Sequence, residues 1–594
     1  MSDPTPVTSP RPAAAGPARA PRHRATARLP VATLLAPLVA LVLVALAGAR
    51  GLGGSRRPGD GALTAPAYAL LRGDPAPGAL SPEGLGGVHT AVAASLTRAF
   101  VRHETLAGAQ RELLWVVLVV SAVLLWRTAR RLGVPDGAAA VGVLVLGGVS
   151  VATGLSTSGT PAALAVPWLL AAALLLARAR MQRAATGGAV LAAVLAVLLA
   201  PDSLLLIGAA AAAALVGDDR GRRAGWARTV LLVAVPLLAG VRLLLPAWAP
   251  EPPGPDWSGA APVLLSVTFL GTAALAGWLL PGFRPVAVAL AVLTLLSVAP
   301  PTGRLAGAVL GLPVAALLIA ALAAAAAERL AARAGPRGRV APATGTAALL
   351  LLVVPAVAGL VTAPGGDLGA RADAGLVGWA RDQLPAGTTL RTDRQLAAEL
   401  LHAGGDPTRL TTGARPVPGE GAGTVLGVVR GPGDGSVVAR FPGDGDPGLS
   451  VTAPQPDRVS TAQRQARQDL AAALRAGVAS VPEEAADVLA AGDVDPRLLT
   501  LLAGISSRFG LGLAGLPPVP GEVPGTLVRQ AVIASVGGSP VPADGAATAR
   551  LQSWLDAQRE PFAPDRVERV DGGVLVAYRL VADPDGLVSP AGGG

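Results

Sequence analysis

The sequence predicts a polytopic α-helical membrane protein with about eleven transmembrane helices, followed by an extracytoplasmic α/β domain. Of the 594 residues, 52% are hydrophobic and only 15% are charged, and the mean hydropathy is +0.53. A water-soluble core does not need so many Ala, Leu and Val residues, so a soluble cytoplasmic enzyme is excluded. Long apolar runs fill residues 29–363, whereas residues 364–594 mix helix and strand patterns.

Residues 1–28 are predicted to be a disordered cytoplasmic tail, because they are rich in Pro, Ala and Arg. The first apolar run covers about 29–49. A cleaved signal peptide has a shorter apolar core that starts closer to Met1, so this run is expected to remain as a helix. The arginines of the tail place it on the cytoplasmic side of the membrane.

Ten further apolar runs complete the predicted transmembrane domain, 29–363. They cover about 113–126, 137–155, 161–177, 185–200, 203–216, 229–246, 261–280, 285–300, 305–327 and 345–363. With one run leading out and the next leading back, every cluster of arginines between runs falls on the cytoplasmic side. This count predicts a multi-pass plasma-membrane protein whose residues 364–594 are extracytoplasmic. The weakest assignments are the short pair 185–200 and 203–216, and losing one of them would invert the rest.

The charge is divided unevenly along the chain. Residues 1–363 carry 29 Arg against 13 acidic residues, a net charge of +16, whereas residues 364–594 carry 20 Arg against 26, a net charge of −6. The basic excess lies in short loops between apolar runs, where it sets membrane orientation, so nucleic-acid binding is not expected. The chain has no Cys, which excludes disulfides, thiolate metal sites and Cys nucleophiles.

The first outer loop, 50–112, contains two stretches, about 61–72 and 88–100, whose apolar spacing predicts helices along the membrane surface. Asp60 lies about ten residues beyond the first run, and the loop leads into a second run that ends at Arg130-Arg131-Leu132. Over roughly residues 29–220 this pattern resembles the GT-C superfamily of membrane glycosyltransferases. The protein O-mannosyltransferase-like (glycosyltransferase family 39) and aminoarabinose-transferase-like branches are the most similar, in an actinobacterial type with an outer C-terminal domain.

The resemblance implies an inverting transfer of a sugar from a polyprenyl-phosphate donor to a cell-envelope glycan, lipid or protein. Asp60 is the expected carboxylate base, because it can take the proton of the attacking acceptor hydroxyl. Guanidinium groups would neutralise the departing phosphate, and His89 falls where the family often has a His-Pro-Pro motif. The candidate phosphate ligands are Arg56, Arg57, Arg72 and Arg304. Asp256, in the Pro-rich loop 247–260, is a candidate contact to the acceptor.

The sequence also departs from the family pattern. Gly61 stands where a Glu often follows the catalytic Asp, and the second outer loop at 156–160 has no carboxylate. One carboxylate makes a poor Mg²⁺ or Mn²⁺ site, so no cofactor or metal is expected. Asp60, between two glycines, is also a typical turn residue. The alternative function is therefore a catalytically inactive GT-C-like scaffold that presents its C-terminal domain to envelope partners. A transporter is disfavoured, since the later runs carry few ionisable residues.

The extracytoplasmic domain is predicted to be a layered, Rossmann-like α/β sheet with a Gly/Pro-rich segment at 404–457. The predicted helices cover about 372–383, 394–403, 461–476, 482–491, 495–508 and 546–558. The predicted strands cover about 388–392, 424–430, 436–441, 510–515, 527–536 and 573–580. No Gly-rich run lies between a strand and a helix, so a nucleotide-binding loop is not expected. Recognition of the acceptor or of a partner is the expected role.

Overall fold

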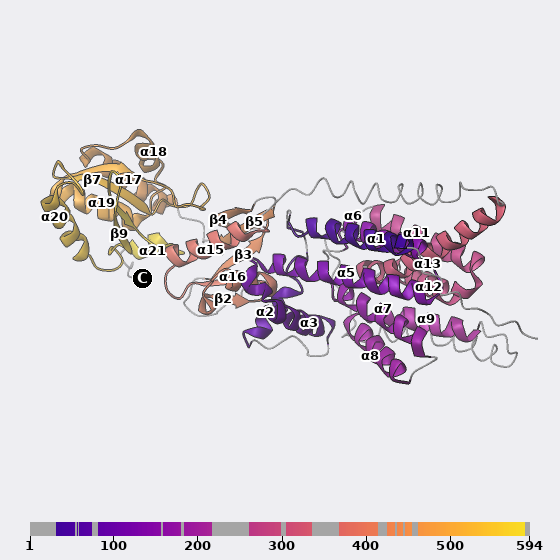
Figure 1. The fold of residues 1–594 in the computed structure, drawn as a ribbon. Coiled ribbons are helices and arrows are strands. Elements are labelled where there is room, and N and C mark those ends of the chain that lie inside the picture. Colours follow the sequence, from indigo (N-terminus) through magenta and orange to yellow (C-terminus); the bar gives the residue numbers. More distant parts are fainter. Residues whose placement is uncertain are drawn as a thin grey trace, which may run out of the picture.

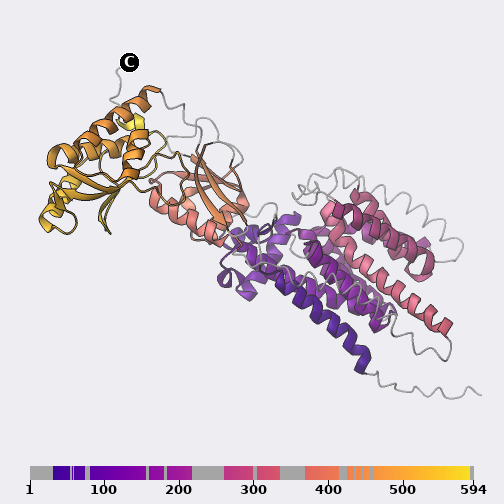
Figure 2. The same ribbon diagram turned by 90° about the horizontal axis from the view of Figure 1, so that it is seen from above.

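A computed structural model gives the fold of the protein (Figure 1). The structure describes residues 31–53, 56–57, 59–73, 81–155, 159–179, 183–216, 260–298, 304–334, 368–413, 425–433, 436–443, 446–453 and 461–588. A bundle of apolar helices, a loop region and two strand-containing units follow one another along the long axis of the molecule (Figures 1 and 2).

Nine of the predicted apolar runs are helices in the described residues. They are α1 (Val31–Arg50), α5 (Leu106–Arg131), α6 (Asp136–Ala152), α7 (Pro161–Ala179), α8 (Arg183–Leu199), α9 (Ser203–Val216), α11 (Ala260–Leu279), α12 (Arg284–Val298) and α13 (Arg304–Ala334). A short 3-10 turn, η2 (Pro281–Phe283), joins α11 to α12. Two predicted runs, 229–246 and 345–363, lie outside the described residues, as do the tail 1–28 and the predicted boundary at 364.

By length and composition, three of the described helices can cross a membrane, namely Leu106–Arg131, Pro262–Leu279 and Leu305–Arg329. Five further apolar helices have only 10–17 residues with described side chains, namely Leu35–Arg50, Asp136–Ala152, Pro161–Leu176, Ala185–Leu199 and Pro281–Ser297. These helices support a membrane protein, while the count of eleven spans and the orientation remain predictions.

Close packing of small residues holds the bundle together. Gly142 on α6 faces α13, and a Cβ at this position would lie 2.9 Å from the Ala316 carbonyl oxygen and 3.0 Å from the Ala320 Cβ. Any larger side chain would push α6 and α13 apart. Small residues at such crossings are typical of helix packing in lipid, where van der Waals contact rather than hydrophobic exclusion drives association.

The loop between α1 and α5 folds into α2 (Thr64–Leu71), α3 (Pro82–Thr97) and the single turn α4 (Ala99–Arg102). The Ser81 hydroxyl accepts a hydrogen bond from the Gly84 amide at 3.0 Å and caps α3. Thr105 caps α5 in the same way, through the Gly108 amide at 3.1 Å. Figure 1 places α2 and α3 at the end of the bundle that faces the strand-containing units.

The first C-terminal unit, residues 368–453, contains α15 (Ala370–Gln383), α16 (Arg394–His402) and a 3-10 turn, η3 (Pro407–Arg409). Its strands are β1 (Thr389–Thr392), β2 (Leu410–Thr412), β3 (Val425–Arg430), β4 (Ser436–Gly443) and β5 (Asp446–Ala453). The sheet order is β2-β1-β3-β5-β4, parallel across β2, β1 and β3 and antiparallel across β3, β5 and β4. The segment predicted as Gly/Pro-rich, 404–457, thus holds four of the five strands.

The second C-terminal unit, residues 461–588, contains α17 (Thr461–Gly477), α18 (Glu483–Ala491), α19 (Pro496–Phe509), α20 (Gly545–Asp556) and α21 (Pro584–Val588). Its strands are β6 (Leu511–Gly515), β7 (Gln530–Val536), β8 (Ser539–Pro540), β9 (Arg566–Val570) and β10 (Gly573–Ala577). They pair antiparallel in the order β6-β7-β10-β9, with β8 on β7. The prediction of a Rossmann-like sheet is therefore wrong, because the strands form two sheets and the second is entirely antiparallel.

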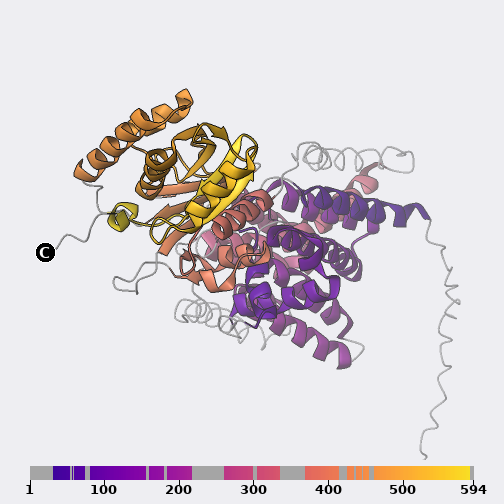
Figure 3. The ribbon, with the colours of Figure 1, turned by 90° about the vertical axis from the view of Figure 1, so that its left-hand side faces the viewer.

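The two units are joined by the segment between β6 and β7. The Arg440 amide of β4 donates to the Gly521 carbonyl at 2.7 Å, and the Val523 amide donates to the Val438 carbonyl at 3.1 Å. This segment therefore extends the edge of the first sheet. Figure 3 looks along the molecule from the end occupied by the second unit.

Candidate functional site

Asp60 belongs to the loop after α1 and lies beside the N-terminal end of α5, in a turn held by an ion pair. Arg111, on the second turn of α5, donates from Nη2 to Asp60 Oδ2 at 2.6 Å and from Nε to Oδ1 at 3.3 Å. The Arg57 amide also donates to Oδ2, at 2.7 Å. Asp60 is 1% exposed and Arg111 is 3% exposed. Both carboxylate oxygens of the predicted base are therefore occupied in this conformation.

Glycine is required on the C-terminal side of Asp60. Gly61 has a φ of +92°, a conformation that L residues rarely adopt. A Cβ at this position would also collide with the carboxylate of Glu399, which belongs to α16. The family resemblance expects a second acid at position 61. The structure instead brings a carboxylate to this place from the first C-terminal unit.

Glu399 is the centre of a second charge cluster. Its Oε1 pairs with Arg56 of the loop, and its Oε2 accepts from Arg430 Nη2 at 2.7 Å. Arg430 also donates to Asp373 of α15 at 2.9 Å. Glu399 is 3% exposed and Arg56 is 8% exposed. We call Arg56, Asp60, Arg111, Glu399 and Arg430 the charged cluster.

Hydrogen bonds and ring contacts support the cluster on both sides. Gln395 Nε2, on α16, donates to the Asp60 carbonyl at 2.5 Å and to Glu399 Oε1 at 3.0 Å. His402, at the end of α16, contacts the Phe100 carbonyl oxygen through Nε2 at 2.9 Å and lies edge-on to the Tyr68 ring at 5.2 Å. The loop and the first C-terminal unit therefore form one packed interface.

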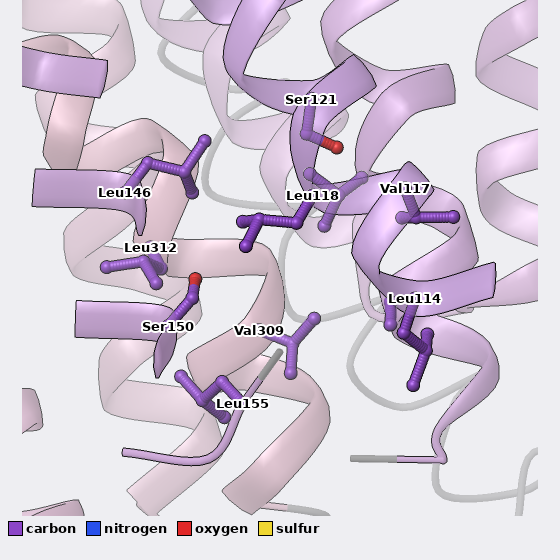
Figure 4. Close-up of a pocket in the computed structure, with 11 residues that line it drawn as sticks. Leu114, Val117, Leu118, Ser121, Leu146, Ser150, Leu155, Val309 and Leu312 are labelled. Carbon is purple, nitrogen blue, oxygen red and sulfur yellow. The ribbon is translucent and has the colours of Figure 1, made fainter. Parts of the chain in front are cut away.

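A cavity of about 40 Å³ lies among the helices (Figure 4). Leu114 lines it three residues after Arg111, which corresponds to a rise of about 4.5 Å. Helices α5, α6, α7 and α13 supply mostly aliphatic walls, together with Ser121 and Ser150. The Ser121 hydroxyl is buried without a hydrogen-bond partner in the described residues. The site therefore combines a charged end and an apolar hollow.

The other predicted site residues are distributed differently. Arg57 is exposed and contributes its amide to Asp60, whereas exposed Arg72 bonds to the Tyr68 hydroxyl at 3.2 Å. His89, on α3, contacts the Leu85 carbonyl oxygen through Nδ1 at 3.0 Å and lies edge-on to Trp168 at 6.0 Å. Arg304 begins α13, but its side chain lies outside the described part of the structure. Asp256 lies outside the described residues altogether.

Sequence reasoning missed Arg111, Glu399, Arg430 and Asp373. For Arg111 the sequence does offer a signal, because it is a charged residue directly before the apolar run that starts near 113. The others lie in the C-terminal domain, and Glu399 is separated from Arg56 by 343 residues. In the described residues, no group of three or more His, Asp and Glu side chains is arranged to hold a metal ion.

Asp373 gives the interface a pH dependence. Burial raises its pKa to about 6, and the nearby Glu399 carboxylate adds to the increase, while Arg430 and Arg56 oppose it. A raised pKa means that the folded chain holds this proton more strongly than the unfolded chain, whose Asp has a pKa of 3.8. The stabilisation is complete below pH 3.8 and is lost as the pH rises through about 6.

We therefore expect the melting temperature of the wild type, relative to that of Asp373→Asn, to fall between pH 4 and pH 6 and to level off above about pH 6. Differential scanning fluorimetry of both purified proteins across this range measures the difference. A difference that stays constant with pH would contradict the assignment of the titration to Asp373.

No family model matches the chain, and no curated protein matches it either. Among solved structures, the cryo-EM structure of the arabinofuranosyltransferase AftD from Mycobacteria is similar over 61% of this chain, at 18% identity and a TM-score of 0.35. The match covers 30% of the AftD chain, so this chain spans less than a third of that protein. A similarity this weak carries no argument, so the function is argued from the residues of this chain.

Proposed function

We propose that the chain is an outer-face membrane glycosyltransferase of the GT-C type, which transfers a sugar from a polyprenyl-phosphate donor to a cell-envelope acceptor. The observation that carries the proposal is that two buried carboxylates, Asp60 and Glu399, lie beside buried guanidinium groups. Burying charged groups costs several kcal/mol per ion unless they are well paired. A buried ion pair adds little net stability compared with apolar packing, so stability alone does not account for the cluster.

The position of the charged cluster fits a lipid phosphate. It lies at the end of α5, and the apolar cavity follows along the same helix. A polyprenyl-phosphate sugar has the same order of groups, with an anionic phosphodiester on an apolar chain. Its phosphate would meet Arg111 and Arg56. The first part of its chain would lie beside Leu114 and Leu118, which requires the helices around the 40 Å³ cavity to move apart.

The reaction needs one base and one cation. Asp60 would take the proton of the acceptor hydroxyl as the hydroxyl oxygen attacks the anomeric carbon of the donor sugar. The bond from the anomeric carbon to the phosphate oxygen breaks, and its electron pair leaves with the polyprenyl phosphate. Arg111 would stabilise the charge of that leaving group, and attack from the opposite face inverts the anomeric centre.

In the conformation described, Asp60 and Arg111 neutralise each other. The donor phosphodiester, with one negative charge, would compete with Asp60 for the guanidinium of Arg111. The second negative charge develops on the polyprenyl phosphate as the bond to the anomeric carbon breaks, so Arg111 would bind the leaving group more strongly than the donor. Donor binding would then free the carboxylate and place the cation on the leaving group in one step. Access also requires α16 to move, since Gln395 contacts the Asp60 backbone.

A second candidate is the inactive membrane scaffold. The specific observation in its favour is that the Asp60 side chain is 0% exposed, with both oxygens bonded. In this alternative the charged cluster is only a clamp that holds the first C-terminal unit on the loop. The scaffold needs no donor and no opening of the ion pair.

Donor binding separates the two candidates. Native mass spectrometry of the detergent-purified chain with added polyprenyl-phosphate mannose is expected to show a one-to-one complex. Arg111→Gln should weaken it by about tenfold or more, because one charge-assisted phosphate contact is lost. Arg98→Gln, an exposed arginine of the same loop, is the matched control and should bind like the wild type.

Absence of any complex with polyprenyl-phosphate mannose, arabinose or glucose would favour the scaffold. Binding that Arg111→Gln leaves unchanged would place the phosphate elsewhere and would remove Asp60 from the reaction. Because Arg111→Gln also loses the ion pair with Asp60, binding is compared at a temperature below the melting temperature of every variant, where each chain is folded.

A further inference from the structure

A cleft of about 760 Å³ lies between the two C-terminal units, away from the charged cluster. One wall consists of α15 and β4 of the first unit, with Trp379 and Phe441. The other wall is the second sheet, with Val532 and Leu575, and the segment between β6 and β7 forms the floor. Its size lies in the range of small-ligand sites in proteins, about 300–1,000 Å³.

The cleft exists because the second sheet is covered by helices on one face only. Side chains alternate between the faces of a strand. On β7 and β10, Ile533 and Val574 point into the core formed with α17, α19 and α20, whereas Val532 and Leu575 point to the opposite face and line the cleft. This open face is therefore the wall of the cleft and not part of a closed core.

The charged side chains that line the cleft are mostly cationic. Three arginines, Arg371, Arg440 and Arg566, face one carboxylate, Asp382. Arg440 is exposed on β4. Arg566, whose side chain is 40% exposed, pairs with Glu568 through Nη2 at 2.8 Å. A guanidinium carries five N–H donors, so this one pair leaves donors of Arg566 for a ligand oxygen.

The walls are fixed relative to each other. Glu522 accepts a hydrogen bond from Trp379 Nε1 at 3.2 Å and pairs with Arg529 of the second unit. Burial raises the pKa of Glu522, and Arg529 opposes the increase. The Leu580 amide also donates to the Gln383 carbonyl at 2.8 Å. Because these links already order both walls, a ligand would lose no binding free energy in bringing them together.

We propose that this cleft binds an anionic saccharide, whose carboxylate or phosphate pairs with Arg440 and Arg566. Arginine forms two parallel hydrogen bonds with either group. The aliphatic wall of Val532 and Leu575 would contact the apolar C–H face of the sugar ring. The cleft is separate from the proposed donor site, so saccharide binding can be tested independently of the proposed transferase activity.

Isothermal titration calorimetry on the full chain in detergent tests the proposal. The probes are a disaccharide of glucuronic acid and N-acetylglucosamine, glucose 6-phosphate and neutral chitobiose. At least one anionic probe should bind roughly tenfold more tightly than chitobiose, and Arg440→Glu should weaken it by a further tenfold or more. The two anionic probes distinguish a carboxylate from a phosphate as the recognised group.

Arg464→Glu makes the same charge change on exposed α17, across the sheet from the cleft, and should leave binding unchanged. Arg111→Gln should also leave it unchanged, which separates this site from the donor site. Three outcomes would overturn the proposal: no binding of either anionic probe at millimolar concentration, equal binding of chitobiose, or equal binding by Arg440→Glu. An oligoglutamate peptide that displaces both sugars would instead identify an acidic peptide as the ligand.

Discussion

Arg111→Met is expected to destabilise the folded chain by about 3–5 kcal/mol, because it leaves the Asp60 carboxylate buried without its cation. Asp60 is 1% exposed, so water cannot replace the lost ion pair without local opening. Removing one partner of a buried pair is much more costly than removing both. Unfolding of the detergent-solubilised chain, followed by tryptophan fluorescence, measures the loss.

The double variant Arg111→Met with Asp60→Leu is the control for this expectation. It removes the charge and the counter-charge together and should recover more than half of the lost stability. Arg98→Met, at an exposed position of the same loop, should have a small effect, within about 0.5 kcal/mol. A destabilisation below about 1 kcal/mol for Arg111→Met alone would show that Asp60 is solvated rather than clamped.

Glu399→Ala is expected to loosen the contact between the loop and the first C-terminal unit. Glu399 is the shared anion of Arg56 and Arg430. Among the described residues, its loss leaves Arg56 with the carbonyl oxygens of Leu368 and Asp60 as hydrogen-bond acceptors. A loss of about 3 kcal/mol in local stability corresponds to roughly hundredfold faster amide exchange. Hydrogen–deuterium exchange at residues 59–65 and 394–402 measures it.

The matched control is Glu484→Ala, an exposed glutamate on α18 in the second C-terminal unit. It should leave exchange at both segments unchanged. If Glu399→Ala also left them unchanged, the contact between loop and unit would depend on packing around Tyr68 and His402 and not on the charged cluster.

The sequence predicts most of the helices, because an apolar run in a chain of this composition has few other solutions. The run 203–216 is α9, and the run 261–280 differs from α11 by one residue at each end. The run that starts near 113 begins seven residues too late, since α5 starts at Leu106. The first two turns of α5 contain the polar residues Gln110, Arg111 and Glu112, so an apolar run does not include them. The N-cap residue Thr105 marks the true start of the helix.

The strands were harder to predict, for two physical reasons. The segment around β5, with the sequence DPGLSVTA, contains Asp, Pro and Gly, which are typical of turns, yet it pairs with β3 on one side and β4 on the other. The hairpin of β9 and β10 turns at Asp571-Gly572, with Gly572 at a φ of +84°. An Asp-Gly pair is a strong hairpin signal that the prediction of a single Rossmann-like sheet did not use.

The candidate site was predictable only on its loop side. Asp60 and Arg56 could be selected because they follow the first apolar run and resemble a family pattern. Their partners could not, since Arg111 is 51 residues from Asp60 and Glu399 is 343 residues from Arg56. Contacts over such separations depend on how the C-terminal unit docks on the loop, which no local pattern records.

The central claim is that a donor phosphate displaces Asp60 from Arg111. A cryo-EM structure of the full chain with bound polyprenyl-phosphate sugar tests it most directly. The account predicts phosphate density within hydrogen-bond distance of the Arg111 guanidinium, with the Asp60 carboxylate turned toward the anomeric carbon. An intact pair between Asp60 and Arg111, with the lipid phosphate bound elsewhere, would contradict it.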